Sequence, residues 1–501
     1  MAFSDPPSLI LLIKKFSVLT ASMVRSTHSP VNPVATRLDR RATRTAACSR
    51  ASRVDIADHA SLQRRCAAAM LGAMALALLS AAASCAAAAQ AAAPPLVGAI
   101  RWDANFDAPG MPDFEDKNFG IVARATTYDL SVAKWHYRVP FFGEEINETA
   151  IVANGNRAEV MGQELEFASK AGINFWSFCN YPIGCKDMHP PDASCGNIQC
   201  CADNVGLSYA WNQYLAHPDN HKVNFTLLLQ PGYWFPTALK GGNETLEQEV
   251  ARYVSYFQMP NYQKVAGGRP LVFLFGGKAE ASDLDALRQA CKKQLGVLPY
   301  ITSMSGQALP QIDAVSRYVT TGGSPSGAAY ADVIQGPEAK QWDSWAAAGK
   351  KVIPTVSAGT EPCAGPVPMT RPLRQLTVLR RWMCSVCAGW DPRPRVTYPC
   401  TYGSPKNCSC PWGGAGGESY TVDPTMEELT AHTTAGLEWV AKHSGDAAEA
   451  NAMLLSAWNE HDEGHWIQPV LEKYGGAQKL DAIKKAIDAV KQRRASYWEQ
   501  F

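Results

Sequence analysis

The chain has 501 residues, of which 46% are hydrophobic and 19% charged, and its formal net charge is +1. These proportions are those of a globular protein and exclude a chain that is disordered throughout. Residues 1–65 hold 11 Lys or Arg against 4 Asp or Glu, so the remainder carries 36 against 42. A mildly acidic remainder argues against a nucleic-acid partner.

The N-terminal part resembles a leader in two pieces. Residues 1–65 are basic, which predicts a solvated, disordered segment. Residues 66–93 carry no charge and follow Arg64 and Arg65, which is the pattern of a signal peptide or of a signal anchor whose positive residues stay in the cytosol. We therefore expect secretion or a lumenal position in the endoplasmic reticulum or Golgi, with a single type II anchor if the segment is uncleaved. A plastid transit peptide is the alternative, because Ser, Arg and Ala dominate.

Cysteine usage also favours the secretory route. Two even-numbered clusters stand in Pro/Gly-rich stretches and predict disulfide-stapled loops in an oxidising compartment. They are Cys185, Cys195, Cys200 and Cys201, and Cys363, Cys384, Cys387, Cys400, Cys408 and Cys410. Structural zinc held by the last cluster is the alternative. Cys179 and Cys291 are expected to be buried free thiols. Four glycosylation sequons agree with a lumenal protein: Asn147, Asn224, Asn243 and Asn407.

Residues 97–501 contain eight short apolar runs separated by helical patterns, which is the signature of a (β/α)8 TIM barrel, here with Cys-rich loop insertions. The expected strands are 97–102, 174–179, 224–229, 271–275, 300–304, 331–334, 351–356 and 453–458. The expected helices include 158–171, 244–256, 281–294, 426–443 and 477–500.

In such a barrel the functional residues lie at the C-terminal ends of the strands. Aromatic and polar residues recur at or shortly after five of the predicted ends, as a saccharide cleft requires. A single Trp is more often part of a core, so the repeated pattern carries the inference. The candidate substrate-binding residues are Trp102, Asp103, Tyr181, Trp234, Trp390, Asp391, Arg395, Asn459, His465 and Trp466.

The segment 454–466 is the most informative in the chain. An apolar run ends in Glu460 and Glu463, three residues apart and framed by Trp458 and Trp466. Two carboxylates beside aromatic rings fit a sugar-cleaving site, because one acid can protonate a leaving oxygen while its partner acts as a base or nucleophile. Such work requires that one acid be protonated while the other is ionised.

A plainer interpretation of the same segment is a helix start. Asn459 is a good N-cap, and acids in a first helical turn are favoured by the helix dipole. An acid pair after an apolar run is structural more often than catalytic. The dense flanking Trp, His and Asn residues favour the catalytic interpretation, because a helix start does not need them.

Residues 458–469 read W-N-E-H-D-E-G-H-W-I-Q-P. They resemble the W-N-E-x-x-E-G-x-x-x-x-P signature of the WbsX-like proteins and the matching segment of the glycoside hydrolase family 99 endo-α-mannosidases. Further segments resemble theirs in the same order: 97–102, 163–176, 261–273 and 389–395. The chain departs from family 99 at 101–103, where a tyrosine-rich strand end is usual, at His461 and Asp462 between the acids, and in the Cys-rich insertions.

This resemblance implies a glycosidase that acts on a glycan or polysaccharide with net retention and without a metal or organic cofactor. Glu463 would be the general acid/base at the glycosidic oxygen. Glu460 would take the proton of the sugar's 2-hydroxyl, which attacks the anomeric carbon to give a 1,2-anhydro sugar. Two alternatives remain: a glycosyltransferase, which is the label of the WbsX-like group, and a non-catalytic carbohydrate-binding barrel.

Overall fold

The computed structural model describes residues 93–105, 124–180, 198–230, 245–276, 278–320, 326–359, 393–394 and 420–498. The leader expected at 1–65, all but the last residue of the expected signal segment 66–93, and most of the clustered cysteines lie outside these ranges. Within the ranges that are described, no helix is both long and apolar enough to cross a membrane.

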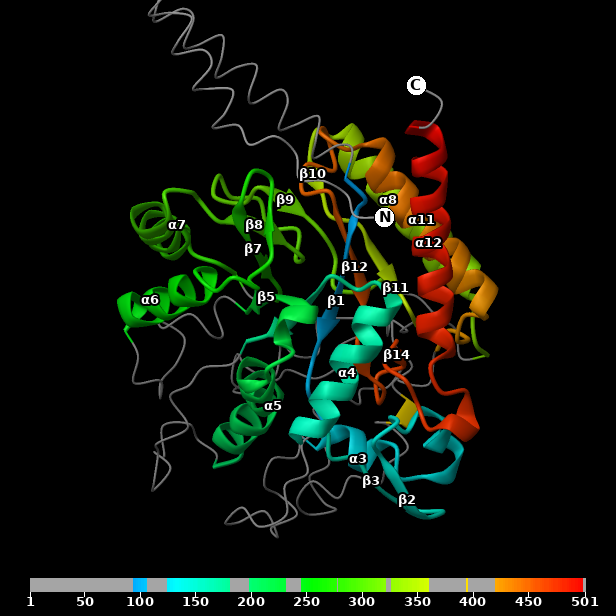
Figure 1. The fold of residues 1–501 in the computed structure, drawn as a ribbon. Helices are drawn as coiled ribbons and strands as arrows, with labels where there is room; N and C mark the ends of the chain where they lie inside the picture. Colours follow the sequence, from blue (N-terminus) through cyan, green and yellow to red (C-terminus); the bar gives the residue numbers. More distant parts are fainter. Residues whose placement is uncertain are drawn as a thin grey trace, which may run out of the picture. The chain divides into compact units, whose positions relative to one another are not determined.

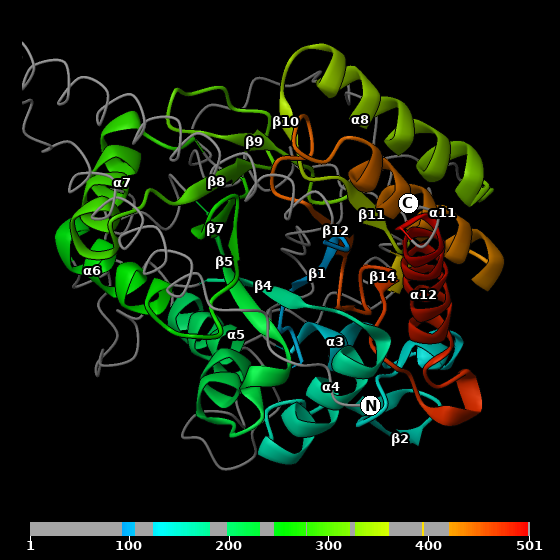
Figure 2. The ribbon, with the colours of Figure 1, turned by 45° about the horizontal axis from the view of Figure 1, so that its top comes forward.

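Parallel strands form the centre of the fold. In the order in which they pair around the sheet they are β10 (Lys351–Val352), β9 (Ala314–Val315), β8 (Tyr300–Ser303), β7 (Arg269–Leu274), β5 (Asn224–Leu229), β4 (Phe175–Cys179), β1 (Leu96–Arg101), β12 (Ala452–Ser456) and β11 (Thr355–Ser357). A two-residue strand, β6 (Lys264–Val265), runs antiparallel to β7. Figure 2 shows the central strands with helices around them.

The two ends of this strand order belong to a single stretch of chain. β10 pairs with β9, whereas β11, two residues further on, pairs with β12. Pro354, between them, has no N–H to donate to the ladder. The backbone nevertheless continues the pairing, because Ile353 N donates to Val315 O at 3.0 Å and Leu454 N donates to Pro354 O at 2.9 Å. The sheet therefore closes into a parallel barrel, which has eight strands in the described chain when 351–357 is counted as one strand.

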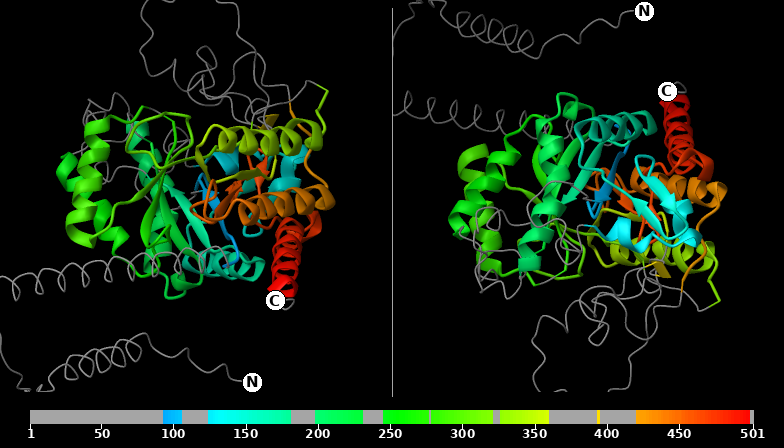
Figure 3. Two further views of the ribbon diagram at one scale, coloured as in Figure 1. Left: turned by 90° about the horizontal axis from the view of Figure 1, so that it is seen from above. Right: turned by 90° about the horizontal axis from the view of Figure 1, so that it is seen from below.

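Helices connect most consecutive strands and lie outside the barrel. They are α4 (Ala158–Ala171), α5 (Ile198–Ala216), α6 (Leu246–Phe257), α7 (Ala281–Leu295), α8 (Gly336–Ala347), α11 (Met426–Lys442) and α12 (Gln478–Trp498). α6 and α11 begin at capping boxes formed by Thr245 with Gln248 and by Thr425 with Glu428. Figure 3 shows α6 and α7 (green) and α11 and α12 (orange to red) on opposite sides of the strands.

The strands have apolar side chains on both faces because both faces are covered. In β5, Leu228 belongs to the apolar cluster inside the barrel, together with Phe273 and Leu454. Its neighbours Leu227 and Leu229 belong to the larger cluster between strands and helices. Each fully buried leucine contributes about 1.5–3 kcal/mol to folding. This two-sided burial explains why the strands read as continuous apolar runs.

Small elements between β1 and α4 cover the C-terminal end of the barrel, towards which β1 points in Figure 1. They are α3 (Ala125–Asp129), η2 (Ala133–Arg138), β2 (Glu144–Asn147) and β3 (Ala150–Val152). The segment between η2 and β2 is tied to the chain that follows the last strand. Phe141 N donates to Pro469 O at 2.9 Å, and Leu471 N donates to Val139 O at 3.0 Å.

The prediction of the sixth strand is wrong. Residues 331–334 lie in a π-helical turn, η6 (Ala331–Gln335), that leads directly into α8. The sixth strand is β9, which has only two residues and follows β8 after a short loop without a helix. A two-residue strand is too short to produce an apolar run, and an apolar run alone does not distinguish a strand from a buried helical turn.

One other expectation needs correction. Cys200 and Cys201, expected in a loop, lie in the first turn of helix α5. Asn224, a predicted glycosylation site, is the first residue of β5, and its Nδ2 donates to Gln263 Oε1 at 3.1 Å. Glycosylation of Asn224 stays a prediction, because a glycosylated amide nitrogen keeps one N–H for this contact. The sequon at Asn147 lies at the exposed end of β2. The buried, unbridged state expected for Cys179 and Cys291 is confirmed.

Candidate active site

The two acids of the 454–466 segment lie in a tight β-hairpin at the C-terminal end of the last barrel strand. Strand β13 (Asn459–Glu460) pairs antiparallel with β14 (His465–Trp466), so the helix-start interpretation is wrong. Gly464 completes the turn with a φ of +82°, a conformation that favours glycine. The turn carries Glu463 back beside Glu460. The sequence spacing of three therefore brings the carboxylates together through a hairpin.

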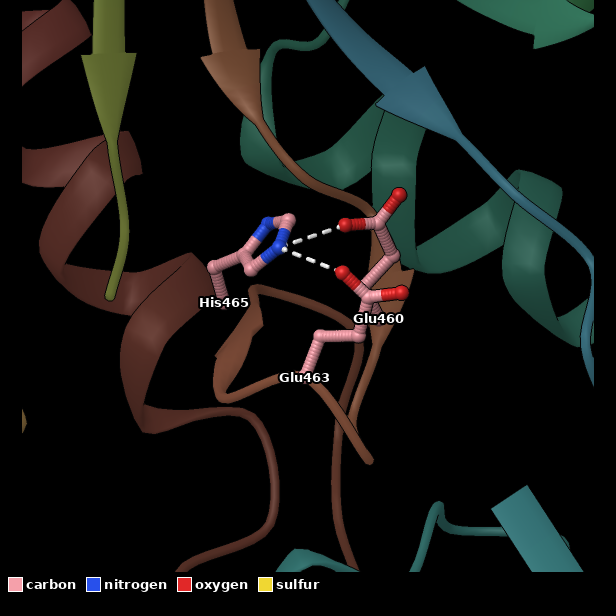
Figure 4. A group of neighbouring side chains, drawn as sticks. All are labelled: Glu460, Glu463 and His465. Carbon is pink, nitrogen blue, oxygen red and sulfur yellow. Dashed lines mark ion pairs between the residues drawn. The ribbon is translucent and has the colours of Figure 1, made fainter. Parts of the chain in front are cut away.

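His465 faces both carboxylates with the same ring nitrogen, as Figure 4 shows. Its Nε2 is 2.6 Å from Oε2 of Glu460 and 3.4 Å from Oε2 of Glu463. The side chain of Glu460 is 2% exposed and that of Glu463 is 11% exposed. Of the pair, Glu463 is thus the acid that retains more access to solvent and to a bound molecule.

Tyr318 and Cys179 complete the surroundings of Glu460. Tyr318 follows β9, and its hydroxyl donates to Oε1 of Glu460. Burial, reinforced by the nearby Cys179 and Glu460, raises the pKa of Tyr318 well above its usual value, so the phenol keeps its proton. Cys179 ends β4, and burial followed by the charge of Glu460 raises the pKa of its thiol. Both neighbours are therefore neutral at ordinary pH.

A buried ion cluster fixes the base of the hairpin to the first strand. Arg101, at the end of β1, contacts Asp103 Oδ1 and Glu164 Oε2, each at 2.8 Å. Asn459 accepts a hydrogen bond from Trp102 N at 2.9 Å and donates to Asp103 Oδ1 at 2.8 Å. Burial raises the pKa of Asp103 to about 6, although Arg101 opposes the shift.

The same cluster continues beneath the hairpin. Glu164 Oε1 accepts hydrogen bonds from Trp458 Nε1, at 2.9 Å, and from Gln468 Nε2. Gln468 Oε1 lies 2.8 Å from His461 Nε2. Because Gln468 offers an oxygen there, His461 must donate with Nε2. Burial lowers the pKa of His461 to about 3, so this ring is neutral.

Of the tryptophans predicted to bind substrate, Trp102 and Trp466 lie within the described residues, and both are mostly buried. Trp466 is 5% exposed and Trp102 is 8% exposed. The ring of Trp466 stacks on that of His461, with centroids 5.5 Å apart, and Lys479 Nζ lies 3.5 Å from its centroid. A face of Trp466 is thus already occupied by protein.

Of the sequence-predicted site residues, the structure brings together Glu460, Glu463 and His465 in a single contact group. Asn459 and Trp466 pair at the base of the hairpin, and Trp102 and Asp103 contact Asn459 from the end of β1. The remaining candidates lie outside the described residues: Tyr181, Trp234, Trp390, Asp391 and Arg395.

Sequence reasoning missed two close neighbours of Glu460. Tyr318 is not predicted as a site residue because the strand before it, β9, is too short for the sequence to indicate. A search of every strand end for phenols would have found it only once that strand was placed. The sequence indicates Cys179 as a buried thiol. Only the pairing of β1 with β4 on one side and with β12 on the other brings the end of β4 near the acids.

The donor atoms of Glu460, Glu463 and His465 lie within 4.8 Å of one another and are of the types that bind divalent cations. Zinc bonds are about 2.1 Å long, which sets two ligand atoms of a tetrahedral site about 3.4 Å apart. The separation of 2.6 Å between His465 Nε2 and Glu460 Oε2 is shorter than that, whereas His465 Nε2 and Glu463 Oε2 stand 3.4 Å apart. In this arrangement the three side chains form an ion-pair contact, and Glu460 would have to move away from His465 for the group to hold a zinc ion.

No protein-family model matches the chain, and no curated protein matches it either. Among solved structures, one similar chain is a glycoside hydrolase-like protein, with 14% identity, a TM-score of 0.41, and coverage of 79% of this chain and 94% of the other. Another is the family 99 endo-α-mannosidase from Bacteroides thetaiotaomicron, with 13% identity, a TM-score of 0.42, and coverage of 80% and 98%. A family 5 mannosidase from Rhizomucor miehei has 11% identity, a TM-score of 0.32, and coverage of 68% and 89%.

Proposed function

We propose that the protein is a glycoside hydrolase that acts on a glycan or polysaccharide through Glu460 and Glu463. The observation that carries this proposal is the position of the pair. Two buried carboxylates share a histidine at the C-terminal end of the last strand of a parallel barrel, which is where enzymes of this architecture carry their catalytic groups.

The separation of the acids supports a retaining reaction. Carboxyl groups of inverting glycosidases stand about 6.5–9.5 Å apart to admit a water molecule, and those of retaining enzymes about 5–5.5 Å apart. The contacting oxygens of Glu460 and Glu463 lie within 4.8 Å of each other. This separation is shorter than the spacing of inverting enzymes and closer to that of retaining ones.

The roles follow from the motif resemblance and from exposure. Glu463, the more exposed acid, donates its proton to the glycosidic oxygen as the bond to the anomeric carbon breaks. Glu460 takes the proton of the 2-hydroxyl, whose oxygen forms the new bond to the anomeric carbon. In the second step Glu463 takes a proton from the attacking water, and Glu460 returns its proton to the 2-oxygen. The net change is hydrolysis, and both acids end in their starting states.

A glycosyltransferase is the weaker candidate. The D-x-D triplet at residues 283–285 lies near the start of helix α7, whereas a site for a nucleotide sugar would be expected at the strand ends. Asp283 there is 7% exposed, so it is poorly placed to bind a metal–diphosphate.

The test is hydrolysis of a panel of α- and β-linked glycans by the full chain, produced in the secretory pathway of a eukaryotic host. Release of a reducing end by the wild type, and its loss in Glu460→Gln and Glu463→Gln, is the expected result. A wild type that binds a glycan tightly but releases no product would leave the carbohydrate-binding barrel as the better description.

We also propose that the protein enters the secretory pathway, on the strength of the uncharged segment 66–93 and the paired arginines before it. In the same expression experiment the protein should carry a glycan at the exposed Asn147. A protein that stays unglycosylated and enters plastids would contradict this proposal.

A further inference from the structure

His465 is the residue on which the two acids converge, and the hairpin register puts it there. It lies directly opposite Glu460 in the β13–β14 pair. Directly opposed residues of an antiparallel pair project from the same face. The imidazole is fully buried, and its Nε2 faces Oε2 of Glu460 at 2.6 Å and Oε2 of Glu463 at 3.4 Å (Figure 4).

The partners of the ring determine which nitrogen carries the proton. An ionised carboxylate can only accept a hydrogen bond, so Nε2, which faces Glu460 and Glu463, is the protonated nitrogen in the neutral ring as well as in the charged one. On the other side, Nδ1 lies 3.4 Å from the hydroxyl oxygen of Ser456, which is able to donate to it. The neutral Nε2–H tautomer therefore suits both sides of the ring.

The contacts are unequal, and the inequality distinguishes the two acids. Oε2 of Glu460 faces His465, and its Oε1 accepts the hydroxyl of Tyr318. A hydrogen bond to one oxygen and a close ring nitrogen, positively charged when the imidazole is protonated, beside the other both favour the ionised form of a carboxylate. Glu463 is 0.8 Å farther from Nε2 than Glu460 is, as the two distances of 2.6 and 3.4 Å show, and its side chain is more exposed. Among the described residues, the thiol of Cys179 and the phenol of Tyr318 are further titratable groups that interact with Glu460 and Glu463, and Asp103 interacts with Cys179.

We propose that His465 is a positioning residue for the reaction proposed above, on which this inference rests. Its Nε2–H holds the Glu460 carboxylate ionised and aimed as the base, which leaves Glu463 as the acid that carries the proton. In this arrangement a single donor assigns different roles to two chemically identical side chains.

Kinetics test this assignment through two variants. His465→Phe keeps a ring but removes the donor, and we expect kcat to fall about 100-fold, the usual cost of losing one preorganised donor, with KM little changed. The acid limb of the kcat/KM profile should move to higher pH, because Glu460 then gains a proton more readily. His465→Gln keeps an N–H at the position of Nε2 and should restore the limb and most of kcat. The proposal is overturned if His465→Phe folds but the acid limb of its kcat/KM profile does not move. It is also overturned if the two variants have the same pH profile of kcat/KM.

A second measurement needs no turnover and separates this inference from the proposed function. In the full chain labelled with ¹⁵N-histidine, the resonance that is absent from His465→Gln identifies His465 among the ten histidines. We expect the Nε2–H tautomer, with a downfield proton that moves upfield in Glu460→Gln and changes less in Glu463→Gln. An Nδ1–H tautomer, or a larger change in Glu463→Gln, refutes the assignment. The expected spectrum in a protein that cleaves no glycan refutes the proposed function alone.

Discussion

Asn459 donates its side-chain amide to Asp103 Oδ1 at 2.8 Å, and this contact joins the last strand of the barrel to the first. The two residues are 356 positions apart in the chain. The carboxylate also accepts from Arg101, which in turn holds Glu164 beneath the hairpin. The position of Glu460 and Glu463 therefore depends on a buried polar cluster as well as on the turn that carries them.

Replacement of either acid by glutamine should remove most activity. The amide keeps the shape of the carboxyl group but neither gives nor takes the proton, and general acid–base groups contribute about 10²–10⁴-fold to turnover. Glu460→Gln and Glu463→Gln should each lose that factor while glycan binding, followed by titration calorimetry, stays nearly intact. Asp462→Asn should cost much less, and Glu159→Gln, on the exposed side of α4, should cost nothing. Full activity in both glutamine variants would defeat the assignment.

The 2-hydroxyl of the substrate should be essential if the reaction passes through a 1,2-anhydro sugar. A substrate that lacks this hydroxyl has no internal nucleophile, so its cleavage should be undetectable. Slow cleavage of the same substrate would instead indicate that Glu460 attacks the anomeric carbon itself. Time courses with matched 2-hydroxy and 2-deoxy substrates distinguish the two routes.

Glu164 should be important for stability. Glu164→Gln removes a buried charge from Arg101 and weakens the acceptor for Trp458. Breaking a buried ion pair costs about 3–5 kcal/mol, and we expect about 3 here because Asp103 still faces Arg101. Urea unfolding measures the change. Glu166→Gln on the same helix removes a solvent-exposed pair with Lys170 and should be indistinguishable from wild type. Equal stabilities for the two variants would contradict the role of the cluster.

The burial of His461 should make the protein less stable in mild acid. Its pKa is about 3 in the fold and about 6.5 in an unfolded chain, so between these values the unfolded state binds the extra proton. Stability should therefore fall as pH decreases through this window, by about 1.4 kcal/mol per pH unit, or about 2 kcal/mol from pH 6.5 to 5. The raised pKa of Asp103 acts in the opposite direction between about 4 and 6.

Comparison of variants isolates the contribution of His461. His461→Gln keeps the donor to Gln468 and should reduce the difference in unfolding free energy between pH 7 and pH 5 by about 2 kcal/mol. His221→Gln, at an exposed position, should leave that difference unchanged. Parallel pH profiles for wild type and His461→Gln would show that His461 is not held neutral.

Gly359 should be irreplaceable for activity. A Cβ at this position would lie 1.9 Å from the carbonyl oxygen of Gly464, which directly follows Glu463 in the turn of the hairpin. Gly359→Ala must therefore push the turn aside, and a misplacement of about 1 Å can cost about 100-fold in rate. Gly336→Ala places its Cβ 3.5 Å from the nearest atom and serves as the control. Unchanged kcat in Gly359→Ala would mean that the hairpin tolerates displacement.

The sequence by itself determined the elements whose signal is local. The apolar runs of β1, β4, β5 and β12 are long enough to be read as strands because both of their faces are buried, and helices such as α4 and α11 have clear periodic patterns or caps. The sequence also singled out Glu460 and Glu463, since paired acids among aromatics are conspicuous.

Only the tertiary structure decided what surrounds them. β9 has two residues, and it pairs with β8 before it and with β10 beyond helix α8, so neither it nor Tyr318 after it carries a local signal. Likewise, the contact between His465 and both acids depends on a hairpin whose residues are equally good for starting a helix. Long-range pairing selected the hairpin, because Trp458 and Asn459 bind to the end of β1, hundreds of residues earlier in the chain.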